Sequence, residues 1–190
     1  NYGVHLNYFI EETPLGTAGS VKNAGDFLDE PFVVISGDAL TDINLEKAIH
    51  FHKQNRSMAT LVLKRVEVPL EFGVVVTDPK GSITRFLEKP NWGEVFSDTV
   101  NTGRYILDPS VLDYLEAGKK FDFSQDLFPM LLKDKQPMYG YITNEYWCDI
   151  GNPQTYLSAH YDMLAKRVHH DFDGKNIGNG VWIGKGVKID

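Results

Sequence analysis

Apolar residues follow two different spacings along this chain of 190 residues. Between residues 4 and 10 they alternate with polar residues, which predicts a β-strand built on Val4, Leu6, Tyr8 and Ile10. The run FVVI at 32–35 is apolar throughout, which is typical of a strand buried on both faces of a parallel sheet. Residues 59–66 and 72–78 are β-rich, and PKGS at 79–82 predicts a turn before the next strand pattern, ITRFLEK.

Helical spacing occurs between these strand patterns. It predicts a helix over 18–28 and another behind the capping candidates Asp42 and Asn44, with Leu45, Ala48, Ile49 and His52 on one side. Asp108-Pro109 and Asn152-Pro153 are start signals for two more helices. The alternation of strands and helices predicts an α/β fold with a mostly parallel sheet.

Two further segments have unusual patterns. Pro129 interrupts FSQDLFPMLL, which otherwise indicates a helix capped by Ser124, so we expect a kink or two short segments there. Near the end, Ile177, Ile183 and Ile189 recur with a period of six in IGNGVW, IGKGVK and I. Hexapeptides of this kind are typical of a parallel β-helix, but two copies are also compatible with a Gly-rich hairpin.

Composition and charge narrow the classes of function. With 42% hydrophobic and 24% charged residues the chain resembles an ordinary globular protein. A net charge of −7 argues against nucleic acid or an anionic membrane as the main partner. A single cysteine, Cys148, excludes an internal disulfide framework and fits a reducing compartment. Because no apolar run approaches membrane-spanning length, we expect a cytoplasmic protein.

Two aspartates stand where ligands bind in open α/β sheets. Asp38 follows Gly37 directly after the apolar run at 32–35, and Asp149 comes before Gly151 after another apolar stretch. The carboxyl end of a central strand is the usual ligand edge of such a sheet, and Mg²⁺ is commonly held by one or two carboxylates. Each aspartate alone is better explained as a turn or a helix cap, as we expect for Asp42, but the pair favours a metal site.

Two other stretches carry candidate chemistry. EETPLGTAGSVKNA at 11–24 is rich in glycine, but its Gly16–Gly19 spacing matches neither a P-loop nor a dinucleotide fingerprint. FLEKP at 86–90 places Glu88 beside Lys89, where Pro90 favours a bend that would turn both side chains toward one target. A lysine neutralises phosphate and a glutamate accepts sugar hydroxyls, but taken alone these two residues are better explained as a solvated surface pair.

The order of motifs PLGTA, GD, EFGVV, FLEKP, NTGRYIL and YWCDIG resembles the sugar-1-phosphate nucleotidyltransferases, and most closely their mannose-1-phosphate guanylyltransferase-like members. The resemblance covers nearly the whole chain. It implies a Rossmann-like catalytic domain portion over 1–168, a linker over 169–176, and the first repeats of a left-handed β-helix over 177–190.

The resemblance also implies roles for individual residues. Mg²⁺ would be held by Asp38 and Asp149, which together with Lys89 form the catalytic set. The residues that would contact the sugar phosphate are Gly73, Glu88, Lys89, Asn101 and Thr102. The residues that would contact the nucleotide are Glu11, Pro14, Gly16, Thr17 and Gly37.

The implied reaction joins a nucleoside triphosphate and a sugar 1-phosphate to give an NDP-sugar and pyrophosphate. Under this resemblance Glu11 reads the base edge. A carboxylate only accepts hydrogen bonds, and guanine alone presents two adjacent donors, so GTP is the expected nucleotide and mannose 1-phosphate the expected sugar. The register between Glu11 and Glu12 stays open.

The sequence also departs from the family pattern. A Gly-rich G-x-G-[TS]-R loop, which would grip the triphosphate, is expected ahead of Asn1 and is not in the sequence. We therefore expect these 190 residues alone to be inactive or barely active. We also expect a homo-oligomer, because the end of a β-helix is open to self-association.

Three alternatives stay open. One is a glucose-1-phosphate uridylyl-, thymidylyl- or adenylyltransferase, because the pocket residues serve either sugar. Another is a non-catalytic regulatory subunit that binds an NDP-sugar, which the retained Asp38, Lys89 and Asp149 disfavour. The third is a Mg²⁺-dependent glycosyltransferase, which the hexapeptides and the EKP motif disfavour.

Overall fold

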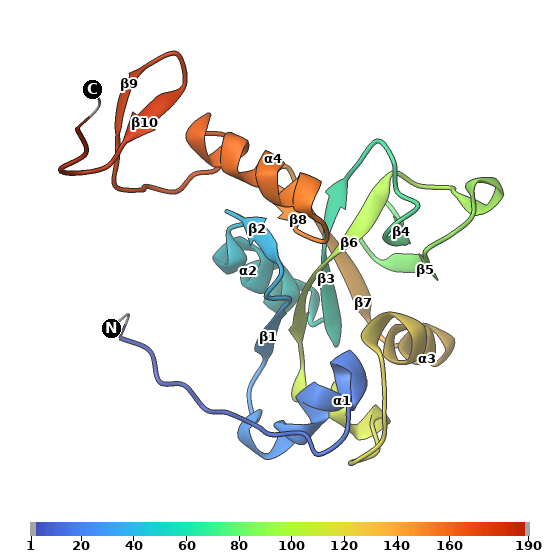
Figure 1. Ribbon diagram of the computed structural model, residues 1–190. Coiled ribbons are helices and arrows are strands. Elements are labelled where there is room, and N and C mark those ends of the chain that lie inside the picture. Colours follow the sequence, from blue (N-terminus) through green and yellow to red (C-terminus); the bar gives the residue numbers. More distant parts are fainter. Residues whose placement is uncertain (1–2, 189–190) are drawn as a thin grey trace. The chain divides into compact units, whose positions relative to one another are not determined.

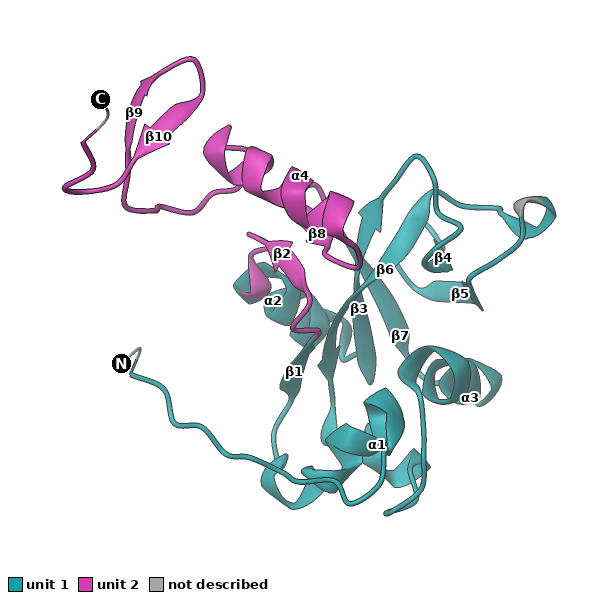
Figure 2. Cartoon of the chain, in the orientation of Figure 1, with its two compact units in different colours: residues 1–35, 46–142 teal, residues 36–45, 143–190 magenta. Residues whose placement is uncertain are grey.

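The computed structural model of the protein describes residues 3–188, which form two compact units (Figure 2). Unit 1 comprises residues 1–35 and 46–142, and unit 2 comprises residues 36–45 and 143–190. Among residues 3–188, no helix is both long and apolar enough to cross a membrane.

A six-stranded sheet forms the centre of unit 1 (Figure 1). Five strands follow one another in the order β5 (Ile83–Glu88), β4 (Gly73–Thr77), β6 (Thr99–Leu107), β3 (Ala59–Arg65) and β7 (Met138–Thr143). The sixth, β1 (Phe32–Ile35), pairs with β6. The expected α/β architecture with a central sheet is therefore present.

The prediction of a mostly parallel sheet is wrong for this part of the chain. The pairings of β1 and β3 with β6, and those of β4 with β5 and β6, are all antiparallel. The β4–β5 connection gives the physical reason, because a tight turn can only join antiparallel strands. In this turn the amide of Asp78 donates to the carbonyl of Ser82 at 2.8 Å.

Helices cover the sheet of unit 1 on both faces. The main core lies on one face, under α1 (Gly16–Asn23), α3 (Phe128–Lys133) and the π-helical turn η4 (Phe123–Leu127). Leu61, Leu63, Tyr105 and Phe128 are buried there. On the opposite face lies α2 (Leu45–Asn55), where the buried His52 is hydrogen-bonded through Nδ1 to Thr60 Oγ1 of β3 at 2.9 Å.

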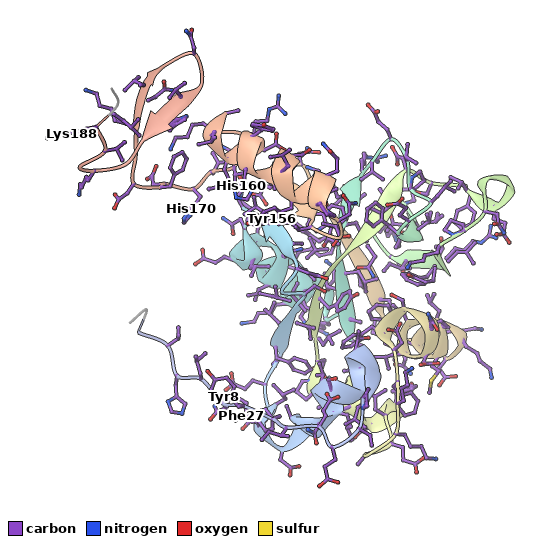
Figure 3. The ribbon with its side chains drawn as sticks, viewed as in Figure 1. Tyr8, Phe27, Tyr156, His160, His170 and Lys188 are labelled. Atoms are coloured by element: carbon purple, nitrogen blue, oxygen red, sulfur yellow. The ribbon has the colours of Figure 1, made fainter. Side chains whose placement is uncertain are left out.

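Both strand predictions for the first 35 residues need correction. Residues 4–10 form no strand, and Tyr8 and Ile10 are 82% and 88% exposed (Figure 3 labels Tyr8). A strand needs a neighbour for its backbone groups, and within residues 3–188 none lies beside this segment. The apolar run at 32–35 is β1, but it is only half-buried, and Ile35 is 54% exposed.

Most helix predictions for unit 1 are confirmed with changed boundaries. The helix expected over 18–28 is α1 followed by the 3-10 turn η1 (Gly25–Phe27). Behind Asp108 a 3-10 helix, η3 (Pro109–Tyr114), replaces the expected α-helix, and another 3-10 turn is η2 (Trp92–Glu94). Pro129 separates two short segments as expected, since it lies at the start of α3 directly after η4. The cap of η4 is Asp122, not Ser124, because the Asp122 carboxylate accepts the amides of Ser124 and Gln125.

Unit 2 contains a two-stranded sheet of β2 (Ala39–Thr41) and β8 (Trp147–Asp149), which leads into α4 (Pro153–Leu164). Asn152 caps α4 through the amides of Gln154 and Thr155, as the sequence predicts. At the other end of α4, the indole of Trp182 donates to the carbonyl of Leu164 at 2.9 Å.

The hexapeptide segment forms an antiparallel hairpin of β9 (Lys175–Gly178) and β10 (Val181–Ile183), so the start of a β-helix is not seen. Its turn is Asn179-Gly180, with φ values of 51° and 75°. Positive φ at both residues is what the favoured two-residue hairpin turn requires. Residues 175–183 therefore form the Gly-rich hairpin that the sequence allowed as an alternative. The third repeat position, Ile189, lies outside the residues that the structure describes.

Candidate functional site

Glu88 and Lys89 lie at the end of β5, where the chain turns sharply. Lys89 has a φ of 44°, so the strand ends there and the predicted bend is present. Gly73 of β4 pairs with Glu88, and a Cβ on Gly73 would lie 2.6 Å from Glu88 Oε2 and 2.9 Å from the Phe86 ring. A side chain at position 73 would therefore collide with the Glu88 carboxylate and the Phe86 ring, and glycine avoids this collision.

We predict that Gly73→Ala lowers the free energy of unfolding by about 1–3 kcal/mol, the usual cost of overpacking. The new methyl group would push the Glu88 carboxylate out of its place. Urea unfolding measures the first effect, and the carboxyl ¹³C shift of Glu88 the second. Gly93→Ala is the control, since nothing lies within 4 Å of a Cβ there. Equal stability of both variants, with an unchanged Glu88 shift, would contradict the prediction.

Asn101 lies at a bulge in β6. Leu63 and Leu61 of β3 are paired with Asn101 and Tyr105, so residues 102–104 lie opposite Val62 alone. The bulge contains Gly103 with a φ of 71°, and the amide of Gly103 donates to Asn101 Oδ1 at 3.0 Å. Bulges of this kind redirect side chains near functional sites. Here it directs the Asn101 amide toward Tyr105 and Ser124.

Tyr105 and Ser124 join this group, and the sequence analysis missed both. Asn101 Nδ2 donates to the Tyr105 hydroxyl at 2.9 Å and to Ser124 Oγ at 3.4 Å. The position of Tyr105, four residues beyond Asn101 in one strand, could have indicated a shared face. No spacing signal leads to Ser124, which comes from a different element. We call the group of Gly73, Glu88, Lys89, Asn101, Tyr105 and Ser124 the Glu88 cluster.

Thr102 contributes differently from its neighbour. Its side chain is buried, and Thr102 Oγ1 donates to the carbonyl of Val62 at 2.8 Å. The hydroxyl is therefore used inside the sheet, and only the backbone of Thr102 could contact a ligand. Its predicted role in sugar binding now depends on that backbone.

The Glu88 cluster has a perturbed electrostatic environment. Burial raises the pKa of the Glu88 carboxyl, while Ser124 and the charge of Lys89 oppose this rise and the charge of Asp122 adds to it. Burial also raises the pKa of Tyr105 to about 12, so its hydroxyl stays protonated at neutral pH. A carboxyl group with a raised pKa beside an exposed lysine is typical of a functional site.

The loop of residues 14–19, here called the GTA loop, is held by its own protein rather than open to phosphate. The amides of Ala18 and Gly19 both donate to the carbonyl of Phe121, at 3.0 and 3.1 Å. Gly16 has a φ of 72°, and a Cβ there would lie 2.5 Å from the same oxygen. These two amides are therefore not available to bind phosphate, in agreement with the sequence spacing.

Glu11 is partly exposed and is hydrogen-bonded to the GTA loop, whereas Glu12 is exposed. Glu11 Oε2 accepts the amide of Leu15 at 3.0 Å. Hydrogen bonds from Ser20 and from this amide lower the pKa of the Glu11 carboxyl. Glu11 is thus an ionised acceptor at neutral pH, with one oxygen already engaged. Its predicted contact with a base edge stays a prediction, as does that of the exposed Pro14.

The two predicted metal ligands belong to the same unit. Ala39 pairs with Asp149, and the amide of Ile150 donates to the carbonyl of Asp38 at 2.9 Å. The backbones of Asp38 and Asp149 are therefore neighbours, with Gly37 in the turn just before. Two carboxylates fit the hard oxygen donors that Mg²⁺ takes from a protein. Among residues 3–188, no group of three or more His, Cys, Asp or Glu side chains is placed to hold a metal.

Asp42 does not cap α2 as expected. Its carboxylate accepts the amide of Tyr146 at 2.6 Å, the amide of His169 at 2.8 Å and the ring Nδ1 of His169 at 2.7 Å. These hydrogen bonds from His169 and Tyr146 lower the pKa of the Asp42 carboxyl against the opposing effect of burial. Asp42 therefore anchors the end of β2 within unit 2.

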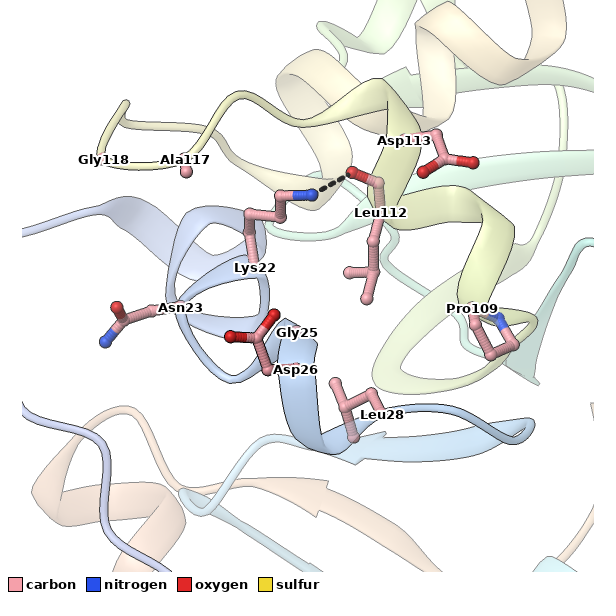
Figure 4. A pocket seen from close by; sticks show the side chains of 10 residues that line it. All are labelled: Lys22, Asn23, Gly25, Asp26, Leu28, Pro109, Leu112, Asp113, Ala117 and Gly118. Atoms are coloured by element: carbon pink, nitrogen blue, oxygen red, sulfur yellow. Dashed lines mark hydrogen bonds between the residues drawn. The ribbon is translucent and has the colours of Figure 1, made fainter.

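A cavity of about 530 Å³ lies elsewhere in unit 1, between α1, η1 and η3 (Figure 4). Lys22 crosses it and donates to the carbonyl of Leu112 at 2.9 Å. Asp26 and Asp113 also line it, but none of the residues predicted from the sequence does. The candidate site residues are therefore those of the Glu88 cluster and the predicted metal ligands Asp38 and Asp149.

Comparison with known proteins gives consistent results. A family model described as nucleotidyl transferase matches residues 1–166. The UTP–glucose-1-phosphate uridylyltransferase of Synechocystis sp. is 37% identical, over 98% of this chain and 52% of that protein. The mannose-1-phosphate guanylyltransferase of Mycobacterium tuberculosis is 32% identical, over 99% of this chain and 59% of that protein. The chain therefore spans about half the length of these curated relatives.

The fold is also found among solved structures. HddC from Yersinia pseudotuberculosis complexed with GMP-PN matches with a TM-score of 0.67 and 27% identity, over 80% of this chain and 64% of that chain. This match confirms the mixed α/β fold with a central sheet flanked by helices.

Proposed function

Since this chain belongs to the nucleotidyl transferase family, we propose that it serves the transfer of a nucleotidyl group from a nucleoside triphosphate to a sugar 1-phosphate. A phosphate oxygen of the sugar 1-phosphate attacks the α-phosphorus, the bond to the β-phosphate bridge oxygen breaks, and pyrophosphate leaves. The attacking oxygen is already anionic and needs no general base. The residues of the protein therefore act by positioning and by charge neutralisation.

The observation that carries this proposal is the Glu88 cluster. A half-buried carboxyl, an exposed lysine and an oriented amide come together on β5 and β6, where the family resemblance places the sugar phosphate. Lys89 supplies a positive charge for phosphate, and Glu88 and the side-chain oxygen of Asn101 supply acceptors for hydroxyl groups. Both amide hydrogens of Asn101 are used by Tyr105 and Ser124. A site of this kind suits a phosphorylated sugar better than an apolar ligand.

Asp38 and Asp149 are proposed to hold Mg²⁺. The two aspartates, whose backbones are neighbours, would supply carboxylate oxygens as ligands, and bound Mg²⁺ would neutralise charge on the phosphates during transfer. The net charge of −7 is then compatible with anionic substrates.

We propose GTP and mannose 1-phosphate as the substrates. The ionised Glu11 suits the two adjacent donors of guanine. The mannose-1-phosphate guanylyltransferase of M. tuberculosis and the HddC complex with GMP-PN support this choice. A glucose-1-phosphate uridylyltransferase is the second candidate, because the Synechocystis relative has that name.

The test is pyrophosphate release in Mg²⁺ with each of five nucleoside triphosphates and with mannose or glucose 1-phosphate. It is run on the chain alone and on the chain joined to the N-terminal segment of the Synechocystis relative. Release with GTP and mannose 1-phosphate by the joined protein only, with the chain alone inactive, is the expected result. Release with UTP and glucose 1-phosphate would refute the guanine argument. NDP-sugar binding without any release would favour a regulatory subunit instead.

A further inference from the structure

Asp122 connects the GTA loop to the segment that carries Ser124. Thr17 Oγ1 donates to Asp122 Oδ2 at 2.8 Å and accepts the amide of Phe123 at 3.0 Å. The other carboxylate oxygen, Oδ1, accepts the amides of Ser124 and Gln125 at 2.8 and 2.9 Å. Each oxygen of one carboxylate therefore holds a different segment.

The segment that Asp122 caps reaches the Glu88 cluster. Ser124 lies in the first turn of η4, and its Oγ accepts Asn101 Nδ2 at 3.4 Å. η4 has π-helical hydrogen bonding, an irregular geometry that is often found at functional sites. A displacement of Asp122 would move Ser124 and with it the hydrogen bonds of Asn101.

The charge of Asp122 also acts on the Glu88 cluster. It raises the pKa of Glu88 and of Tyr105, in addition to the larger effect of burial on each. Asp122 is therefore connected to this cluster both through a chain of hydrogen bonds and through its charge.

We propose that Asp122 is a positioning residue that couples nucleotide binding at the GTA loop to sugar-phosphate binding at the Glu88 cluster. This inference rests on the proposed function, which assigns the two ligands to these two places. A nucleotide that orders the GTA loop fixes Thr17, Thr17 holds Asp122, and Asp122 holds the turn that orients Ser124 and Asn101. Binding of one ligand then raises the affinity for the other, and the same factor applies in both directions.

The coupling is measured by isothermal titration of the chain with mannose 1-phosphate, with and without saturating GMP. Glucose 1-phosphate with UMP is titrated in parallel. We expect GMP to raise the affinity for mannose 1-phosphate about tenfold, a typical allosteric coupling. Thr17→Val and Asp122→Asn should each reduce this factor to below about twofold; because the factor is a ratio measured within one variant, a change in the affinity without GMP does not enter it. The double variant should lose no more than either single variant, because both remove one connection.

Two controls separate coupling from a structural role. Thr17→Ser keeps the hydroxyl and should restore the coupling. Asp126→Asn removes a charge from the same turn, where Asp126 accepts the amide of Asp122 at 2.7 Å, but leaves the Thr17–Asp122 bond intact. The proposal is overturned if Thr17→Val and Asp122→Asn lose affinity equally for GMP alone and for mannose 1-phosphate alone, and if Thr17→Ser does not restore the coupling.

A measurement without ligands tests the role of Asp122 separately from the proposed function. Carboxyl ¹³C titration should show a lower Glu88 pKa in Asp122→Asn than in the wild type, because a neighbouring negative charge is removed. If neither the wild-type chain nor the joined protein binds either ligand pair, the proposed function fails, and this titration alone decides whether Asp122 reaches the Glu88 cluster. An unchanged Glu88 pKa would refute the connection whatever the ligands do.

Discussion

Replacing Asp149 with asparagine should lower pyrophosphate release by the chain joined to the N-terminal segment of the Synechocystis relative at least about 100-fold, since charge stabilisation by a bound metal is worth several kcal/mol in such reactions. Asp149 belongs to a strand paired with the start of β2, directly beside the backbone of Asp38. Asparagine keeps the shape of the side chain but removes the charge that attracts Mg²⁺. Asp38→Asn should have an effect of the same kind.

A second measurement decides whether the loss of pyrophosphate release in Asp149→Asn comes from the loss of metal binding. Mn²⁺ binding to the chain, followed by line broadening of the amide signals of residues 37–39 and 148–151, reports on the site without turnover. Broadening there should be lost in Asp149→Asn and kept in Asp171→Asn, which changes an exposed carboxylate of the same unit. If Mn²⁺ broadens these signals equally in both variants, Asp149 is not a metal ligand.

Gly16→Ala should lower the free energy of unfolding by at least about 2 kcal/mol, because two penalties add. A residue with a side chain is strained at the φ of 72°, and its Cβ would lie 2.5 Å from the carbonyl oxygen of Phe121. That same oxygen accepts the amides of Ala18 and Gly19, so it has little freedom to move. The measurement is urea unfolding at neutral pH.

Gly118→Ala is the matched control for Gly16→Ala. Gly118 has a nearly identical φ of 75°, but nothing lies within 4 Å of a Cβ there. It should therefore cost only the strain of the left-handed conformation, about 1 kcal/mol. The difference between the two variants measures how tightly the GTA loop packs on residues 119–122. Equal losses would show that the loop can move away from Phe121.

Local signals in the sequence predicted local structure well. Asn152-Pro153 marks the start of α4, and Pro129 separates η4 from α3. The hexapeptides are an exception, because the resemblance implied the first repeats of a β-helix there and the structure shows a hairpin with Asn179-Gly180 in its turn. Each of these outcomes depends on the φ angles and hydrogen bonds of a few adjacent residues, which are directly encoded by the residues themselves.

Pairings between distant residues were not predictable in this way. We expected β1 to belong to a parallel sheet. Its partner is β6, some 70 residues later in the chain, and the two strands run antiparallel. Residues 4–10 have the alternation of a strand but no neighbouring strand among the described residues. Asp42 was expected to cap a helix, and His169 binds it instead. A local pattern carries no information about which distant backbone or side chain will meet it.

The candidate site shows the same division between features that the sequence predicts and features that only the folded chain reveals. Motif order in the sequence alone identified the family. Through that resemblance it also led to the predictions for Asp38 and Asp149 and for the Glu88–Lys89 pair, because each of these residues stands within a quoted motif. Only the tertiary structure revealed that Tyr105, Ser124 and Asp122 complete the surroundings of Glu88. Their contribution depends on orientation, and orientation is set by a strand bulge and a capped turn that meet only when the chain is folded.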